Sequence, residues 1–169
     1  QVKVDTEWDT TSWTYDVMMG LAPETASIDQ INAWQDYSVM PYVNNAPATP
    51  FINANGPGTY WAPMTQDTWT NVWIVVNNDA VDPTFDLYYS EGTDAAVLVE
   101  ADADWRNHPA GLDLNAFGFM AAGWDLTTYT FENVYYTDGE DLTLAAPPVP
   151  EPATLALLGL GALVLRRKK

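Results

Sequence analysis

The feature that most constrains the fold is a series of short runs, apolar or alternating polar and apolar, that are separated by turn-forming residues. Residues 12–18 alternate between polar and apolar side chains, and residues 68–76 are apolar on both faces. The other strand candidates are residues 85–89, 95–99, 117–122 and 128–136, with turn signals at 77–83 and 138–139. Runs of this length and period are typical of β-strands. Their spacing predicts an all-β fold, an antiparallel β-sandwich of the jelly-roll type.

One segment, residues 27–35, has a helical pattern instead. Ser27 is a candidate N-cap, and Ile28, Ile31 and Trp34 would share one side of a helix. An irregular loop or a strand fits the segment equally well, so these alternatives stay open.

Charge and cysteine content exclude several classes of function. The chain has 23 acidic and 6 basic residues, for a net charge of −17, and four of the bases are the last four residues. Lys3 and Arg106 are therefore the only cations in the rest of the chain. Without a cationic patch, we expect no nucleic-acid partner and repulsion from anionic lipid headgroups. The absence of Cys excludes disulfides, thiolate metal sites and Cys nucleophiles.

The C-terminal region has three parts in a fixed order. Residues 145–152 form a Pro-rich linker that contains Pro150, Glu151 and Pro152, and an apolar run follows at 153–165. The chain then ends in four cations: Arg166, Arg167, Lys168 and Lys169. The prolines predict an extended spacer. The apolar run predicts a short C-terminal hydrophobic helix of about 20 Å, against a bilayer core of about 30 Å. Residues 153–169 thus suit a transient transmembrane tail whose cations stay on the cytoplasmic side.

This order of parts resembles the PEP-CTERM sorting signal of exported bacterial proteins. The resemblance implies an exosortase as partner, cleavage near Pro150, Glu151 and Pro152, and loss of the apolar tail, as for tails removed during lipid anchoring. It also implies an exported protein of the cell envelope, outer surface or extracellular matrix that is anchored transiently in the inner membrane. The alternative is a hydrophobic helix packed on the domain. An exported protein needs a signal peptide, and none is present at Gln1, so we expect the domain to lack one or two N-terminal strands.

Residues 1–144 resemble the concanavalin A-like, laminin-G-type jelly rolls. The resemblance covers about residues 60–144 and implies a fold rather than an activity. The segments that carry it are the Trp-rich run 68–77, then 85–89, 104–107 and 131–136, with Gly139 and Leu142. An acidic pair belongs in the last strand of that pattern, and this chain has Glu132 and Asn133 there, which weakens an inherited metal role.

Three carboxylates, Glu100, Asp102 and Asp104, alternate along one predicted strand and would share a face. They are similar to the Glu-x-Asp-x-x-Glu motif of jelly-roll β-glucanases, but Trp105 stands where that motif has its last Glu. A retaining glycosidase needs two carboxyls about 5–5.5 Å apart, whereas strand residues two apart are separated by about 6.6 Å. We therefore predict no catalytic residue here and interpret the row as a solvated strand face.

The remaining ionisable candidates also favour a structural interpretation. His108, the only histidine, lies in a loop sequence at 107–111, and the chain has no Gly-x-Ser-x-Gly motif to accompany it. Arg106 is expected to form a salt bridge with Asp102, Asp104 or Glu132. The chain is accordingly predicted not to be an enzyme.

Two binding sites are predicted. Asn77, Asn78, Asp79 and Asp82 form the densest oxygen-bearing loop and could hold a structural Ca²⁺, the one cofactor we consider. Trp61, Trp105 and Trp124 lie in or near predicted loops, where aromatic rings could stack on sugars of an extracellular polysaccharide; core packing is the alternative for each. The function expected overall is that of a non-catalytic cell-surface or extracellular-matrix protein. The alternatives are a carbohydrate-binding module and a jelly-roll glycan hydrolase.

Overall fold

The computed structural model describes residues 1–4, 17–23, 33–46, 49–54, 60–79, 81–107, 111–121 and 129–143. Within these ranges the regular secondary structure consists of β-strands and one short 3-10 helix, η2 (Trp34–Asp36). The strands are β1 (Val2–Val4), β2 (Val17–Pro23), β3 (Tyr42–Ala46), β4 (Thr49–Asn53), β5 (Trp61–Pro63), β6 (Thr70–Asn77), β7 (Thr84–Glu91), β8 (Val97–Asp104), β9 (Leu114–Ala121) and β10 (Tyr129–Phe131).

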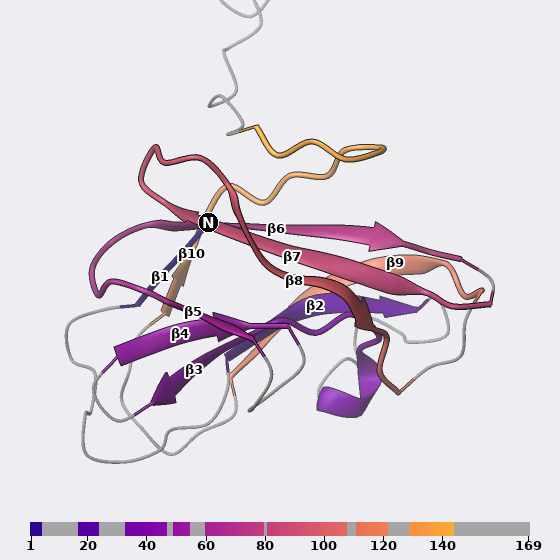
Figure 1. Cartoon of the computed structure of the whole chain (residues 1–169). Coiled ribbons are helices and arrows are strands. Elements are labelled where there is room, and N and C mark those ends of the chain that lie inside the picture. The colour runs from indigo at the N-terminus through magenta and orange to yellow at the C-terminus, as the bar shows by residue number, and fades with distance from the viewer. Residues whose placement is uncertain are drawn as a thin grey trace, which may run out of the picture.

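The strands form two antiparallel five-stranded sheets that stack as a sandwich. The first sheet has the order β10-β1-β6-β7-β8, and the second has the order β5-β4-β3-β2-β9. In Figure 1 the first sheet lies above the second, with β6, β7 and β8 over β2 to β5. The prediction of an antiparallel β-sandwich is confirmed. The predicted C-terminal hydrophobic helix lies outside the described residues.

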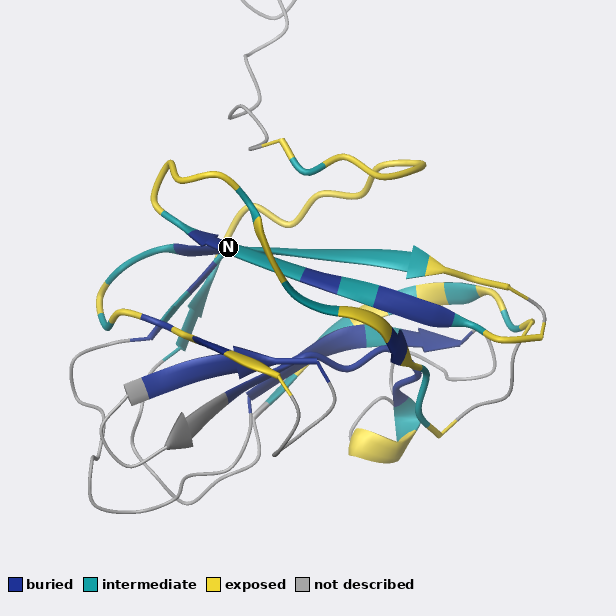
Figure 2. Cartoon of the chain, in the orientation of Figure 1, coloured by how far each residue is buried: buried dark blue, intermediate teal, exposed yellow. Residues whose placement is uncertain are grey.

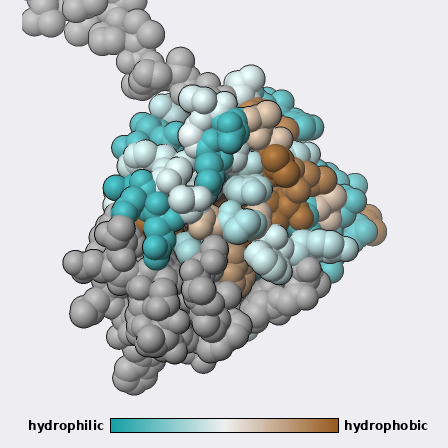
Figure 3. All heavy atoms as spheres, turned by 60° about the vertical axis from the view of Figure 1, so that its left-hand side comes forward, coloured by the Kyte–Doolittle hydropathy of each residue, from teal (hydrophilic) through white to brown (hydrophobic). Residues whose placement is uncertain are grey.

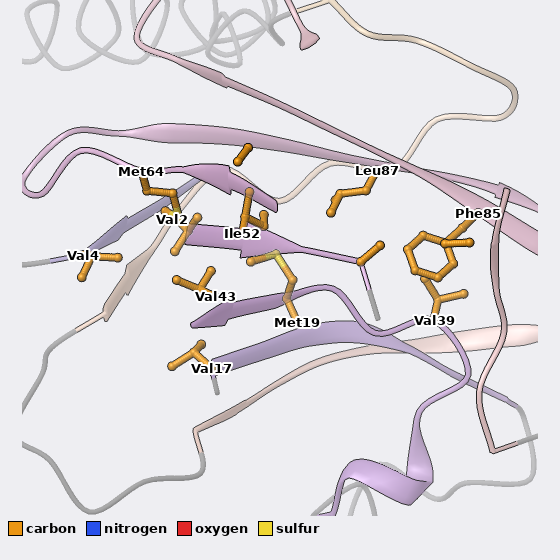
Figure 4. Packing of buried hydrophobic residues seen from close by; sticks show 13 residues of the cluster. Val2, Val4, Val17, Met19, Val39, Val43, Ile52, Met64, Phe85 and Leu87 are labelled. Atoms are coloured by element: carbon orange, nitrogen blue, oxygen red, sulfur yellow. The ribbon is translucent and has the colours of Figure 1, made fainter. Parts of the chain in front are cut away.

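The main core fills the space between the sheets with aliphatic side chains from both. Figure 4 shows Val17, Met19, Val43 and Ile52 of the second sheet, and Leu87 of the first, in the space between the two sheets. Alternation along β7 places Phe85 and Leu87 in the core, and Figure 2 shows the resulting alternation of buried and intermediate segments along this strand. Each fully buried side chain of this size contributes about 1.5–3 kcal/mol of hydrophobic stabilisation.

A smaller cluster covers the outer face of the second sheet. It consists of Met18, Tyr37, Met40 and Tyr42, with Met120 packed against them. The segment after η2 folds back along β2, where the backbone N–H of Leu21 donates to the Val39 carbonyl at 3.0 Å and that of Ser38 donates to the Leu21 carbonyl at 2.9 Å.

Two facing glycines allow this close approach. Gly20 of β2 pairs with Gly118 of β9. A Cβ atom on Gly20 would overlap the carbonyl oxygen of Val39, and one on Gly118 would lie 2.8 Å from the Tyr37 hydroxyl oxygen. Gly20 is thus limited to glycine by the backbone that packs over it, whereas the atom that a Cβ on Gly118 would meet is the tip of a side chain.

Most strand predictions are confirmed with shifted ends. The runs predicted at 68–76 and 85–89 correspond to β6 and β7, and those at 95–99 and 117–122 overlap β8 and β9. The strand predicted at 128–136 is wrong beyond Phe131, because Asn133 takes a φ of 53° and turns the chain out of the sheet. Of the helix candidate at 27–35, only residues 33–35 are described, and they lead into the 3-10 turn. Of the run at 12–18, only the last two residues are described, and they begin β2.

Candidate functional site

Residues 132–143, which we call the strap, connect the sandwich to the C-terminal region. Asn133 Nδ2 donates to the Gln1 side-chain oxygen at 3.0 Å, and Trp73 Nε1 donates to the Thr143 carbonyl at 3.4 Å. Because Ile74 packs against the core, its neighbour Trp73 points to the outer face of the first sheet. Figure 1 shows the strap passing above β6. The chain therefore leaves the domain from the outer face of the first sheet.

Charges and hydrogen bonds fix the end of the strap. The Asp141 carboxylate accepts hydrogen bonds from the backbone N–H and the hydroxyl of Thr143, at 2.9 and 2.7 Å, and these bonds lower the pKa of Asp141. Desolvation raises the pKa of Tyr88, and the carboxylates of Asp86 and Glu140 raise it further. Tyr88 pairs with Trp73 in the sheet, so these shifts are consistent with a strap that packs on this face.

The predicted sorting residues Pro150, Glu151, Pro152, Arg166, Arg167, Lys168 and Lys169 lie outside the described residues. Within the part of the chain that the structure describes, no helix is both long enough and apolar enough to cross a membrane.

Two exposed aromatic residues are adjacent in the sequence at the start of β5. Trp61 is 63% exposed and Tyr60 is 64% exposed. Pairing of Trp61 with Asn53 in β4 fixes its backbone, and its ring centroid lies 5.8 Å from that of Phe51 at an angle of 58°. Phe51 is buried on the neighbouring strand, and its contact leaves most of the Trp61 side chain exposed. Trp61 was predicted, whereas Tyr60 was missed although an aromatic pair directly after a Gly- and Pro-containing segment is a visible signal.

The other two predicted tryptophans are not part of this pair. Trp105 follows β8 in the first sheet and packs against the main core, and its indole N–H donates to the Thr84 carbonyl at 3.3 Å. Trp124 lies outside the described residues. A sugar-binding role for either remains a prediction, and the geometry of Trp105 favours core packing.

The prediction that Glu100, Asp102 and Asp104 share one face is wrong. Glu100 pairs with Leu87 and Asp104 pairs with Thr84, and two irregularities interrupt the register between β7 and β8. Leu87 and Thr84 are three residues apart in a regular strand, so their side chains point to opposite faces, and so do those of their partners. Asp102 has a φ of 52°, and its N–H donates to Asp86 Oδ1 at 2.8 Å. The strand is thus bulged, which period-2 alternation does not anticipate.

Glu100 has the most distinctive environment of these three carboxylates. Burial raises its pKa, and the negative charge of Asp104 raises it further. Its Oε2 atom is buried and has no hydrogen-bond partner within the described part of the chain. A raised pKa is one property of a general acid, but glycoside hydrolysis also needs a second carboxylate aimed at the same bond, and the bulges turn Asp104 to the opposite face.

The predicted calcium loop is ordered by its own polar groups. Asp79 Oδ1 accepts hydrogen bonds from the backbone N–H groups of Val81 and Asp82, at 2.7 and 3.3 Å. Asn78 Nδ2 donates to the Leu112 carbonyl at 3.2 Å. The described residues contain no group of three or more His, Cys, Asp or Glu side chains placed to hold a metal ion. A calcium site that uses Asn77 and Asn78 beside Asp79 and Asp82 remains a prediction.

Arg106 and the following residue join the two sheets. The backbone N–H of Arg106 donates to the Ser38 carbonyl at 2.8 Å, and its guanidinium donates to the Tyr42 hydroxyl at 2.9 Å. Asn107 has a φ of 62°, and its side-chain Nδ2 donates to the backbone carbonyls of Trp34 and Tyr37 at 3.0 and 3.1 Å. We call these contacts of Arg106 and Asn107 with residues 34–42 the clamp, and the sequence did not predict them. The salt bridge predicted between Arg106 and Asp102, Asp104 or Glu132 remains a prediction, and His108 lies outside the described residues.

Comparison with known proteins identifies the C-terminal region. Residues 148–169 match the PEP-CTERM protein-sorting motif. No curated protein and no solved structure gives a significant match to the chain. The motif is that of an exported, envelope-associated protein that an exosortase, a membrane enzyme, sorts and processes. The resemblance of residues 1–144 to concanavalin A-like jelly rolls is supported at the coarser level of a β-sandwich.

Proposed function

We propose that this chain is a non-catalytic protein of the cell surface or extracellular matrix, delivered there through exosortase processing. The observation that carries the proposal is the sorting motif at 148–169, joined to a β-sandwich by a strap fixed on its outer face. The finer assignment of the sandwich to the concanavalin A-like, laminin-G-type jelly rolls is part of the same proposal. Cleavage after the strap would leave the sandwich intact, because the core residues all precede the strap.

The chain has few of the reactive groups that enzymes use. The chain has no Cys and one His, so cysteine nucleophiles and metal sites built on several His or Cys are not available. Catalysis by a pair of carboxylates is not excluded by this composition. The bulges of β8, however, turn the best candidates, Glu100 and Asp104, to opposite faces.

The purified exported protein is expected to leave laminarin, agar and carrageenan uncut over long incubation. The measurement is the release of reducing ends. Sustained release that Glu100→Gln abolishes, and that the control Glu132→Gln retains, would contradict the proposal and favour a glycan hydrolase.

A second candidate function, polysaccharide binding, is favoured by the exposed pair of Tyr60 and Trp61. Aromatic rings bury large areas against the apolar faces of sugars, and a ring fixed by a strand loses little conformational freedom on binding. An exported, envelope-associated protein would meet such polymers outside the cell. The Phe51 contact supports this interpretation, because it holds the Trp61 ring in place before any ligand arrives.

Replacing Trp61 by alanine is expected to weaken retention on polysaccharide affinity gels about tenfold, since the lost stacking corresponds to about 1.4 kcal/mol. Tyr60→Ala should weaken it in the same direction. The control is Tyr136→Ala, which removes another highly exposed ring, on the strap, and should leave retention unchanged. Equal losses in Trp61→Ala and Tyr136→Ala would indicate non-specific adhesion and would exclude the pair as the binding site.

A further inference from the structure

The edge strands β5 and β8 border the same side of the sandwich. β5 ends the second sheet, and β8 ends the first. Cα atoms of the two strands come within 8 Å of each other, which is closer than the spacing of about 10 Å that is usual between stacked sheets. The exposed Trp61, the first residue of β5, therefore lies at an edge that it shares with an acidic strand.

Glu100 is the acidic residue of β8 that points into this edge. It pairs with Leu87, whose side chain lies in the main core, so the Glu100 side chain points from the first sheet toward the second. The Glu100 side chain is only partly buried. Its Oε2 atom nevertheless has no hydrogen-bond partner in the part of the chain that the structure describes. A carboxylate that can still accept hydrogen bonds is thus directed toward the sheet to which Trp61 belongs.

The electrostatic environment of Glu100 favours a cation. Burial raises the pKa of Glu100, and the negative charge of Asp104 raises it further. Asp102, which lies between them in the same strand, is exposed and adds a third negative charge. Burial and the neighbouring charge both make the ionised Glu100 carboxylate costly in the free protein, so a cation placed beside it would offset that cost.

The cations of the body are placed against other aromatic residues. Lys3 and Arg106 are the only cations before the C-terminal cluster. The Lys3 ammonium lies 5.5 Å from the centroid of the Trp69 ring, and the Arg106 guanidinium lies 5.8 Å from that of Trp34 and donates to the Tyr42 hydroxyl. These contacts lie outside β5. An anionic polymer at the edge of β5 and β8 would therefore meet negative charge, whereas a cationic one would be attracted.

Apolar surface accompanies these charges. Val97 and Leu98, at the start of β8, are 55% and 47% exposed. Figure 3 shows hydrophobic side chains gathered on one face of the molecule and bordered by hydrophilic ones. A sugar ring has apolar faces and a polar edge, so a surface that combines aromatic, aliphatic and acidic groups suits a sugar better than it suits a purely charged ligand.

We propose that the polymer bound at Tyr60 and Trp61 is cationic and is built of amino sugars whose free amines are protonated. In this arrangement the Trp61 ring stacks on a sugar ring, and the Glu100 carboxylate accepts hydrogen bonds from the ammonium group. Charge-assisted hydrogen bonds of this kind are about twice as strong as neutral ones. The inference rests on the polysaccharide binding proposed above for the aromatic pair and adds the charge class of the ligand.

Two forms of one ligand test the charge class on the unmodified protein. The probes are oligomers of glucosamine with free amines and the same oligomers after N-acetylation, which removes the charge and keeps the sugar rings. Calorimetric titration of the exported, tail-processed protein is carried out at a pH at which the amines are protonated. Salt at about 0.15 M limits the range of charge interactions to about 8 Å, so distant acidic residues contribute little. The free-amine oligomer should bind about tenfold more tightly than the acetylated one.

Two variants with the same change in charge locate the effect. Glu100→Gln should remove the preference for free amines and leave the affinity for the acetylated oligomer unchanged. Glu132→Gln is the control, because Glu132 follows β10 at the opposite edge of the first sheet from β8, and it should keep the preference. Trp61→Ala should weaken the binding of both oligomers, since both present sugar rings to the indole.

The outcomes separate this inference from polysaccharide binding itself. Equal affinity for the two oligomers, with binding that still depends on Trp61, would overturn the amino-sugar assignment and leave polysaccharide binding standing. So would retention on gels of neutral polymers without binding of either oligomer. A preference for free amines that Glu132→Gln reduces as much as Glu100→Gln would indicate attraction to the net charge alone and would also overturn the assignment. Loss of no binding in Trp61→Ala, for any polymer, would overturn both proposals.

Discussion

Replacing Pro150, Glu151 and Pro152 by alanine is expected to leave residues 153–169 attached to the exported protein. These three residues lie within the matched sorting motif, between the strap and the apolar run. Prolines keep this stretch extended and accessible to a membrane enzyme, which a continuous helix would not be. Intact-mass measurement of envelope-extracted protein should find the unmodified chain ending near residue 152 and the triple variant ending at Lys169.

The retained tail should also change where the protein is found. A helix of about 20 Å with four cations at its end resists release from the inner membrane, so the triple variant should accumulate in the membrane fraction. Pro147→Ala, which lies just outside the matched residues, serves as the control and should be processed normally. Recovery of the unmodified protein with its tail still attached, from cells that contain an active exosortase, would contradict processing at this motif.

The sandwich could be predicted because its long strands carry an unambiguous pattern. Residues 68–76 are apolar on both faces, and Phe85, Leu87 and Tyr89 share one face. The structure places these two runs in β6 and β7. The strands that the prediction missed are short or contain residues that normally interrupt sheets. β1 has three residues, β4 contains Pro50, and β5 ends in Pro63. Such strands form because the surrounding sheet supplies their pairing, and a single sequence does not show that pairing.

The candidate sites were harder to predict for a related reason. The row from Glu100 to Asp104 fails because alternation along one strand cannot reveal a bulge, which depends on the register with β7. Trp61 and Trp105 look alike in the sequence, but one lies on an edge strand and the other packs on the core. The clamp at Arg106 and Asn107 joins residues about 70 positions apart, so no local pattern indicates it. The sorting motif, in contrast, is contiguous and needs no tertiary structure to be recognised.

Replacing Gly20 by alanine is expected to destabilise the sandwich by about 3 kcal/mol, the upper end of the typical cost of overpacking, because the atoms it meets cannot move aside. The new Cβ would overlap the Val39 carbonyl oxygen, which accepts the hydrogen bond from the Leu21 N–H. Because this obstacle is backbone, relief requires the segment after η2 to move away from β2, which breaks that bond and loosens Tyr37 and Met40. For a domain of this size the loss corresponds to a fall in Tm of roughly 6–12 °C.

Gly118→Ala is the matched comparison for Gly20→Ala, because the two glycines face one another across β2 and β9. Its Cβ would meet the hydroxyl at the tip of Tyr37, 2.8 Å away, and the next Tyr37 atoms lie at 3.5 Å. A side-chain tip can shift by a few tenths of an ångström without loss of backbone hydrogen bonds, so Gly118→Ala should cost clearly less. Denaturant unfolding of both variants, followed by tryptophan fluorescence, measures the difference in the free energy of unfolding. Equal losses in the two variants, or no loss in Gly20→Ala, would mean that the segment at 37–40 does not pack against β2 as the structure has it.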